Sequence, residues 1–200
     1  MAEIRNVVFD MGGVLMDFNP TQIARHFAQS DEDAALLAKA VFLDPSWVWL
    51  DAGVVEEATV VWLAQRKLPE RLHATVEEMV YGWYEGRSFH KAANDLAIRL
   101  AESGRSIYLL TNAGPAFPRY RDRIPAYPYF SGVLVSFEER LLKPDARIYQ
   151  TLLDRYGLEA KESVFVDDLE QNVEGAVRAG MRGFHFTGDA AELEAYLQKS

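Results

Sequence analysis

Side chains capable of nucleophilic attack, metal binding and charge neutralisation follow segments that have the apolar pattern of buried strands. The segments are residues 5–10, 106–111, 132–136 and 163–167, and the side chains that end or follow them are Asp10, Thr111, Asn112, Lys143, Asp167 and Asp168. In a parallel sheet the carboxyl ends of the strands meet at one edge, where ligands bind. We therefore expect three carboxylates, a hydroxyl, an amide and an ammonium group to lie together at that edge.

The three carboxylates, Asp10, Asp167 and Asp168, would bring like charges close together. Such a cluster costs free energy unless a cation holds it. A hard divalent ion with oxygen ligands fits this requirement, and Mg²⁺ is the ion that we expect. Taken singly, Asp168 could cap the next helix and Lys143 could be a solvated surface lysine. We favour the cation site because several strand ends carry residues of catalytically useful types at the same time.

The second half of the chain alternates predicted strands with predicted helices. Helices are expected at residues 89–103, 145–156, 171–179 and 190–198, and a last strand is expected at 183–186. Gly104, Gly157 and Gly180 follow three of these helices, where glycine commonly ends a helix. This alternation indicates an α/β fold built on a parallel sheet with helices on both faces.

Between the first two predicted strands, only helices and turns are expected. Asn19 followed by Pro20 has the pattern of a helix start, with asparagine as N-cap and proline at the first helical position. Further helices are expected from Ser30, near Trp47, at 56–67 and at 75–85. Such a run indicates a small helical bundle inserted after the first strand. The predicted domains are a Rossmann-like core at 1–15 and 87–200 and a helical cap at 16–86.

The composition excludes several classes of function. Thirty acidic residues against 21 basic residues give a net charge of −9, which argues against nucleic acid as a partner. The absence of cysteine excludes disulfides, thiolate metal sites and cysteine nucleophiles. No apolar run approaches the roughly 18 residues of a membrane span, and the charged Glu3 and Arg5 come early. We therefore expect a cytoplasmic protein without a membrane span or a secretory signal, and no protein partner is evident.

Four segments resemble the signature motifs of the haloacid dehalogenase-like hydrolase superfamily. In chain order they read VVFDMGGVL, LLTNAG, LLKPDARIYQ and VFVDDLEQNVEGAVRAGM. Their order and the helical insertion resemble the subclass that carries a helical cap after the first strand. The opening DMGGV together with KPDARIYQ is similar to bacterial sugar-phosphate phosphatases, including those that act on α-glucose 1-phosphate.

The resemblance implies hydrolysis of a small phosphate monoester, with a sugar phosphate as the expected substrate. Asp10 would attack phosphorus and form an aspartyl-phosphate, which splits one difficult step into two easier ones. Thr111 would donate its hydroxyl, and Asn112 its backbone N–H, to the phosphoryl oxygens. Lys143 would neutralise charge on the nucleophile and on the phosphate.

The resemblance also implies the residues of the metal site. Mg²⁺ would be bound by Asp10, Asp168 and the backbone carbonyl of Gly12. Asp167 would support the ion through water. The ion would offset the repulsion between an anionic nucleophile and an anionic phosphate. Asn172, one helical turn beyond Asp168, would orient the metal ligands or the lysine.

Position 12 departs from the pattern of these phosphatases. They usually carry a second aspartate two residues after the nucleophile, acting as general acid and then base, where this chain has Gly12. Loss of such a group typically costs about 10²–10⁴-fold in rate. The substrate could carry a better leaving group, such as an anomeric sugar oxygen. Alternatively, water or a nearby acid such as Asp17 could replace the group, or the reaction could need no proton.

The last of these explanations corresponds to a metal-independent 2-haloacid dehalogenase. Halide leaves as an anion, and dehalogenases of this superfamily also lack the second aspartate. Dehalogenase-type sites resemble the site of this fold but lack the acidic pair that Asp167 and Asp168 form here. Such a pair beside Asp10 requires a cation. We therefore rank the phosphatase first, the dehalogenase second, and a non-catalytic relative that binds a phosphate ligand third.

The predicted cap would cover the site and select the substrate. It holds the four tryptophans of the chain, Trp47, Trp49, Trp62 and Trp83. We expect them to fill the core of the bundle, and the alternative is that one stacks on the face of a sugar. The turn at residues 51–53 lies between cap helices, and the sequence leaves open whether it faces the site.

Overall fold

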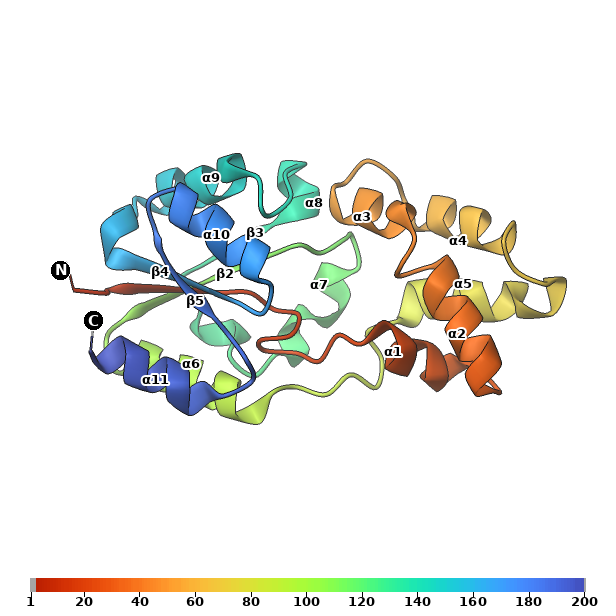
Figure 1. Ribbon diagram of the computed structural model, residues 1–200, viewed down its shortest axis with the longest axis horizontal. Helices are drawn as coiled ribbons and strands as arrows, with labels where there is room; N and C mark the ends of the chain where they lie inside the picture. The colour runs from red at the N-terminus through yellow and green to blue at the C-terminus, as the bar shows by residue number, and fades with distance from the viewer. Residues whose placement is uncertain (1–2, 200) are drawn as a thin grey trace.

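The computed structural model describes residues 3–199, which form a five-stranded parallel sheet with the strand order β3-β2-β1-β4-β5 (Figure 1). The strands are β1 (Asn6–Phe9), β2 (Ser106–Thr111), β3 (Gly132–Val135), β4 (Ser163–Asp167) and β5 (Arg182–His185). The central strand β1 pairs with β2 on one side and with β4 on the other. The predicted α/β fold with a parallel sheet is confirmed.

Different helices cover the two faces of the sheet (Figure 1). One face carries α9 (Ala146–Tyr156) and α10 (Glu170–Arg178), and the other carries α6 (Lys91–Glu102) and α11 (Ala190–Gln198). Successive side chains of a strand point to opposite faces. Val8 therefore packs in the cluster with α9 and α10, whereas Val7 and Phe9 belong to the cluster with α6 and α11. Burial on both faces explains why the strands read as continuous apolar runs.

The helices inserted between β1 and β2 form a second lobe beside the carboxyl ends of the strands, and we call α1–α5 the cap (Figure 1). They are α1 (Pro20–Phe27), α2 (Asp31–Ala40), α3 (Pro45–Asp51), α4 (Glu57–Gln65) and α5 (His73–Gly82). The side chain of Asn19 accepts a hydrogen bond of 3.1 Å from the backbone N–H of Gln22. The predicted start of the first helix is therefore confirmed.

Short helices fill the connections. They are α7 (Phe117–Tyr120), α8 (Ser136–Glu139) and the 3₁₀ turns η1 (Glu70–Leu72), η2 (Arg121–Arg123), η3 (Tyr127–Tyr129) and η4 (Ala160–Glu162). Over residues 3–199, no helix combines the length and the apolar character that crossing a membrane requires.

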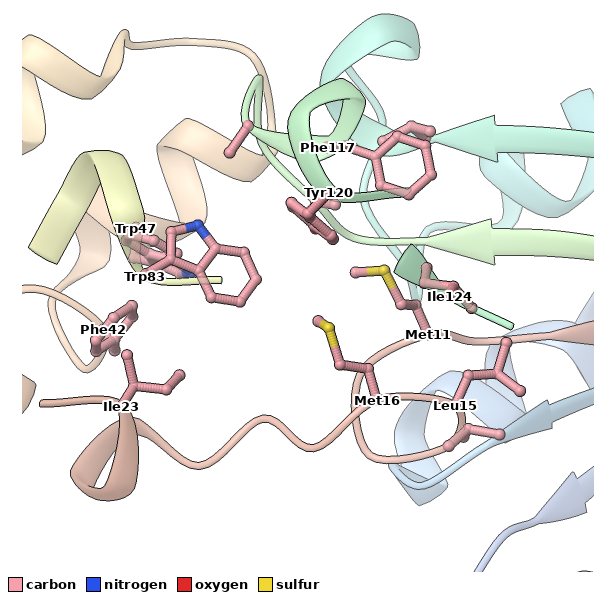
Figure 2. Close-up of a cluster of buried hydrophobic side chains, with 14 of the residues drawn as sticks. Met11, Leu15, Met16, Ile23, Phe42, Trp47, Trp83, Phe117, Tyr120 and Ile124 are labelled. Carbon is pink, nitrogen blue, oxygen red and sulfur yellow. The ribbon is translucent and has the colours of Figure 1, made fainter. Parts of the chain in front are cut away.

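The tryptophans of the cap divide into two pairs. Trp47 and Trp83 are buried and pack edge to face with a ring separation of 5.9 Å, as the sequence predicted (Figure 2). For Trp49 and Trp62 the prediction of a core position is wrong, because their exposed fractions are 48% and 55%. Residues two positions apart on a helix point in different directions, so α3 buries Trp47 and exposes Trp49.

Candidate active site

The predicted site residues converge at the carboxyl edge of the sheet. Asp10 follows β1 and Asp167 ends β4, and these neighbouring strands pair through Phe9 and Val166. The chain order reverses around β1, which is where open α/β sheets form a crevice. A cavity of about 390 Å³ lies there, lined on the core side by Asp10, Gly12, Asn112, Lys143, Asp168 and Asn172.

Two predicted site residues lie at the same edge without lining this cavity. Thr111 is the last residue of β2, with an exposed fraction of 1%. Asp167 is completely buried at the end of β4. Its neighbour Asp168 is partly exposed and reaches the cavity wall.

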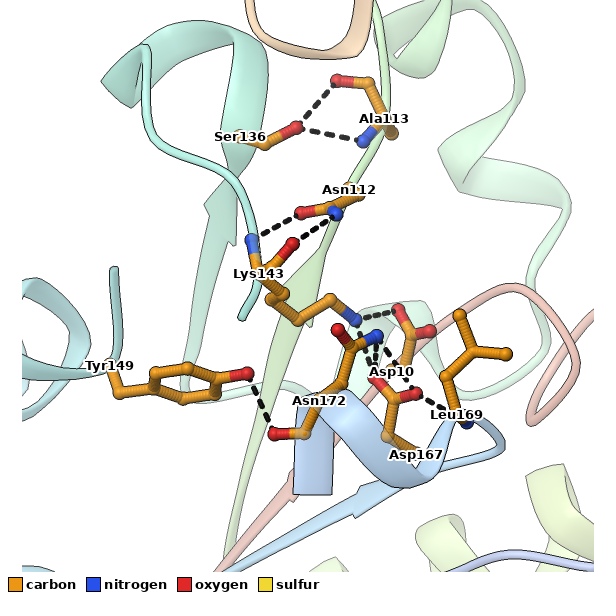
Figure 3. Close-up of polar contacts among 9 residues, drawn as sticks. All are labelled: Asp10, Asn112, Ala113, Ser136, Lys143, Tyr149, Asp167, Leu169 and Asn172. Atoms are coloured by element: carbon orange, nitrogen blue, oxygen red, sulfur yellow. Dashed lines mark hydrogen bonds and ion pairs between the residues drawn. The ribbon is translucent and has the colours of Figure 1, made fainter. Parts of the chain in front are cut away.

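Lys143 connects two of the carboxylates (Figure 3). Its Nζ lies 2.7 Å from Oδ1 of Asp10 and 2.7 Å from Oδ2 of Asp167. The lysine side chain has an exposed fraction of 1%, so it is not a solvated surface residue. Burial alone would lower the pKa of Lys143, but Asp10 and Asp167 outweigh burial and hold this pKa above its ordinary value. Lys143 is therefore a buried ammonium group beside the predicted nucleophile.

Asn112 holds the backbone of Lys143 in place (Figure 3). Its Oδ1 accepts a hydrogen bond of 2.9 Å from the N–H of Lys143, and its Nδ2 donates one of 3.1 Å to the carbonyl oxygen of the same residue. An amide side chain suits this position because it can donate and accept at once. The sequence predicted a role for the backbone N–H of Asn112, and it gave no signal for this contact of the side chain.

Asp167 receives hydrogen bonds on both of its oxygens (Figure 3). The Nδ2 of Asn172 lies 3.1 Å from each oxygen, and the backbone N–H of Leu169 donates to Oδ1 over 2.8 Å. With the ion pair to Lys143, these donors fix the orientation of the buried carboxylate. Asn172 thus contacts Asp167 directly, and its role in orienting the metal ligands or the lysine stays a prediction.

The charges of the cluster fit a hard divalent cation. Asp10, Asp167 and Asp168 each offer a carboxylate oxygen, and these atoms lie within 4.8 Å of one another. Burial is the largest cause that raises the pKa of Asp10 to about 7, with Asp167 adding to the rise and Lys143 opposing it. Burial and then Asp167 also raise the pKa of Asp168. One ammonium group thus leaves the carboxylates undercompensated, and an all-oxygen set suits Mg²⁺.

Gly13 allows Asp168 to approach the loop after β1. Its φ of +74° lies in the left-handed region. A Cβ atom on this residue would stand 2.2 Å from Oδ2 of Asp168. The glycine therefore leaves the space that the carboxylate occupies.

Replacing Gly13 with alanine is expected to displace Asp168 and to weaken Mg²⁺ binding about 10–100-fold, the usual cost of disturbing the surroundings of a metal ligand. Calorimetric titration with Mg²⁺ measures the effect. Gly157→Ala is the matched control, because Gly157 also has a positive φ, +62°, with no atom near the added Cβ. Equal Mg²⁺ affinity in Gly13→Ala and the wild type would contradict this role of Gly13.

Two further polar groups reach the cavity, and the sequence did not predict a role for either. Asp51 ends α3 of the cap, and Tyr120 ends α7 of the core; both line the cavity. Of the turn at 51–53, Asp51 therefore faces the site. Asp17, the acid considered as a substitute for the group absent at Gly12, is not among the residues that line the cavity.

Comparison with protein families gives a match over most of the chain. A model of the haloacid dehalogenase-like hydrolase family matches residues 4–180. The sesquiterpene phosphatase astK of Aspergillus oryzae is 28% identical over 190 residues, covering 92% of this chain and 90% of that protein. A phosphoglycolate phosphatase of Yersinia pseudotuberculosis is 28% identical over 183 residues, covering 88% of this chain and 78% of that protein.

Solved structures share the fold. A HAD-family enzyme of Bacteroides thetaiotaomicron, solved in complex with magnesium and inorganic phosphate, superposes with a TM-score of 0.72 at 18% identity, covering 95% of this chain and 98% of that chain. The L-2-haloacid dehalogenase of Xanthobacter autotrophicus superposes with a TM-score of 0.65, also at 18% identity, covering 90% and 76%. The fold is thus shared with a dehalogenase and with an enzyme solved with magnesium and phosphate, so the activity has to be argued from the site residues.

Proposed function

The chain belongs to the haloacid dehalogenase-like hydrolase family, and we propose that it hydrolyses small phosphate monoesters in a Mg²⁺-dependent reaction. The observation that carries this proposal is the group of Asp10, Asp167 and Asp168, in which one buried lysine pairs with two of the three carboxylates. A cation completes the charge balance of this group. The phosphatases among the relatives, and the Bacteroides enzyme solved with magnesium and phosphate, support the same reading.

The proposed reaction begins with attack of an Asp10 carboxylate oxygen on phosphorus. Lys143 orients that carboxylate through the 2.7 Å contact and neutralises charge as the phosphate approaches. Mg²⁺, held by Asp10, Asp168 and the backbone carbonyl of Gly12, would supply positive charge at the phosphoryl oxygens. Asp167 holds the lysine in place through its ion pair and does not act on the ester itself.

Thr111 and Asn112 are proposed to bind the phosphoryl oxygens, through a hydroxyl and a backbone N–H. Thr111 ends the strand next to β1, so both donors come from the same sheet edge as the nucleophile. The amide side chain of Asn112 is already engaged with Lys143, which leaves its backbone N–H for the phosphate. Together with the lysine, these groups would receive the negative charge that shifts to the oxygens during transfer.

The organic part of the ester would contact the cap side of the cavity. We predict that this organic part is a sugar, so that the substrate is a sugar phosphate. The wall there includes the aromatic rings of Phe18, Phe42 and Trp47, and its polar side chains are Asp51 and Tyr120. Sugar hydroxyls need hydrogen-bond partners, whereas an apolar prenyl group gains free energy by burial alone. Substrate tests therefore have to include both chemical types.

Phosphate release from a panel of esters, with Mg²⁺ and with EDTA, tests the proposed function. The panel contains glucose 1-phosphate, glucose 6-phosphate, phosphoglycolate and a prenyl monophosphate. We expect release from at least one ester, a loss of about 10²-fold or more with EDTA, and recovery when Mg²⁺ is restored in excess. Strong preference for primary over anomeric esters would count against a better leaving group as the explanation for Gly12.

The alternatives predict other results for the same samples. A dehalogenase would release halide from a 2-haloacid in the presence of EDTA. A non-catalytic relative would bind the ester without turnover, and Asp10→Asn would leave that affinity unchanged. Phosphatase activity that is indifferent to EDTA would overturn the proposed function.

A further inference from the structure

Among the described residues, no carboxylic acid on the core side of the cavity is left to serve as proton donor in the proposed reaction. An alkoxide is a poor leaving group, so the ester oxygen of an alkyl phosphate needs a proton as its bond to phosphorus breaks. Gly12 cannot supply one. Of the three carboxylic acids that line the cavity, Asp10 is the nucleophile and Asp168 a proposed metal ligand. The third is Asp51, which comes from the cap.

We propose that Asp51 is the general acid and base of this site and replaces the aspartate that is absent at position 12. The proposal rests on the phosphatase function proposed above and extends it to a residue of the cap. It makes the cap part of the catalytic machinery, so that the reacting groups are complete only when cap and core meet.

Contacts between cap and core hold Asp51 at the cavity. The buried hydroxyl of Ser136, at the start of α8, donates a hydrogen bond of 2.5 Å to the carbonyl oxygen of Asp51. The same hydroxyl accepts a hydrogen bond of 3.0 Å from the backbone N–H of Ala113, in the loop after β2. Ser136 therefore joins the end of α3 to the loop proposed to bind phosphate.

Close backbone packing supports the same placement. A Cβ atom on Gly53 would stand 2.4 Å from the carbonyl oxygen of Phe137, so the turn after α3 lies directly against α8. A Cβ atom on Gly114 would stand 3.4 Å from Oδ1 of Asp51. The carboxylate thus lies beside the loop that carries Asn112, within the space where the ester would bind.

The surroundings of Asp51 keep part of its population protonated near neutral pH. Burial is the largest cause that raises its pKa to about 7; the charge of Asp10 adds to the rise and that of Lys143 opposes it. Besides these two groups, Tyr120 lines the same cavity from α7. A carboxyl group with a pKa near the working pH can give up a proton and take one back.

Tyr120 is the other proton-bearing group on this side of the cavity. Its hydroxyl is buried and has no hydrogen-bond partner among the described residues. Burial, with the charges of Asp51 and Asp10, raises the pKa of Tyr120 well above its usual value. Tyr120 can therefore donate a hydrogen bond to the ester or to the carboxylate, but it is too weak an acid to give up its proton.

The proton and the electrons balance over two steps. An oxygen of Asp10 bonds to phosphorus, the bond between phosphorus and the ester oxygen breaks, and that oxygen takes the proton of Asp51 to leave as an alcohol. The Asp51 carboxylate then takes a proton from the water that attacks the phosphoryl group on Asp10. Inorganic phosphate leaves, and both aspartates return to their starting forms.

The test compares leaving groups in Asp51→Asn, which keeps the shape of the side chain and removes the acid. The esters are 4-nitrophenyl phosphate, whose leaving group needs no proton, and a primary alkyl phosphate. We expect kcat/KM to fall about 10²–10⁴-fold for the alkyl ester and less than about 10-fold for the aryl ester. Because kcat/KM reports steps up to the first irreversible one, it isolates the departure of the leaving group. Retained activity on the aryl ester also shows that the variant is folded.

A second substitution tests the chemical role rather than the position. A Cβ atom on Gly12 would have Phe18 as its nearest neighbour at 3.6 Å, an ordinary contact, and Gly12 does not have a positive φ. Gly12→Asp added to Asp51→Asn is therefore expected to restore at least about 10-fold of the lost activity on the alkyl ester. Tyr120→Phe alone is expected to lower kcat/KM for the two esters by a similar factor.

The outcomes separate the two proposals. Equal losses on both esters, or no loss on the alkyl ester, would overturn the role of Asp51 and leave the phosphatase function standing. A wild-type protein that releases phosphate from no ester in Mg²⁺ would overturn the phosphatase function, and the role of Asp51 with it.

Discussion

Asp10→Asn is expected to lower kcat/KM for any phosphate ester by at least about 10⁴-fold, because an amide cannot form the aspartyl-phosphate. The substitution preserves the shape of the side chain of a residue that is 7% exposed, and it removes a charge that burial already disfavours. The free energy of unfolding is therefore expected to stay the same or to rise. Phosphate release in Mg²⁺ and urea unfolding, measured on the same preparation, check both results.

Binding separates loss of the nucleophile from loss of the site. The Asp10→Asn variant keeps Lys143, Asn112 and Asp168 at the cavity, so it should still bind inorganic phosphate in the presence of Mg²⁺. A variant that keeps more than about 1% of wild-type activity would show that another group attacks phosphorus.

Lys143→Met is expected to reduce both activity and stability. Removing the ammonium group leaves Asp10 and Asp167 as buried carboxylates without their shared partner, and breaking such a buried pair typically costs about 3–5 kcal/mol. The loss of positive charge beside the nucleophile is expected to lower kcat/KM about 10²–10³-fold. Urea unfolding measures the first effect, and steady-state kinetics in Mg²⁺ measures the second.

An exposed pair of the same chemistry provides the control. Lys91 pairs with Asp95 four residues along α6, and the lysine side chain is 86% exposed. Lys91→Met should change the free energy of unfolding by less than about 1 kcal/mol, because water screens the pair. A similarly small change in Lys143→Met would contradict the view that Lys143 holds the buried carboxylates together.

The groups that follow the strands could be predicted because the information is local. A short apolar run ending in an acid places Asp10 and Asp168 at the edge of a sheet, whatever covers that sheet. The burial of Lys143 could be suspected only from the carboxylates expected at the same sheet edge, since a lysine in a loop is ordinarily solvated. Of its two partners, Asp10 follows β1 and Asp167 ends β4, and the pairing of these strands brings both within reach of one ammonium group.

Contacts between distant segments could not be predicted in the same way. The side chain of Asn112 forms hydrogen bonds with the backbone of Lys143, 31 positions away, and no local sequence pattern indicates that pairing. Asp51 faces the site because α3 meets α8 through Ser136, a contact between cap and core. Trp49 is exposed for a related reason: α3 is short, and the core covers only one side of it.

Detection of a phosphoryl group on Asp10 itself tests the proposed aspartyl-phosphate mechanism. The wild-type protein is mixed with Mg²⁺ and an ester that it hydrolyses, quenched in acid within the first turnover, and examined by intact and peptide mass spectrometry. The proposed mechanism predicts a protein that carries one phosphoryl group on the peptide containing Asp10, and no such species in Asp10→Asn. Release of phosphate without any phosphorylated protein, or a phosphoryl group on a different residue, would contradict it.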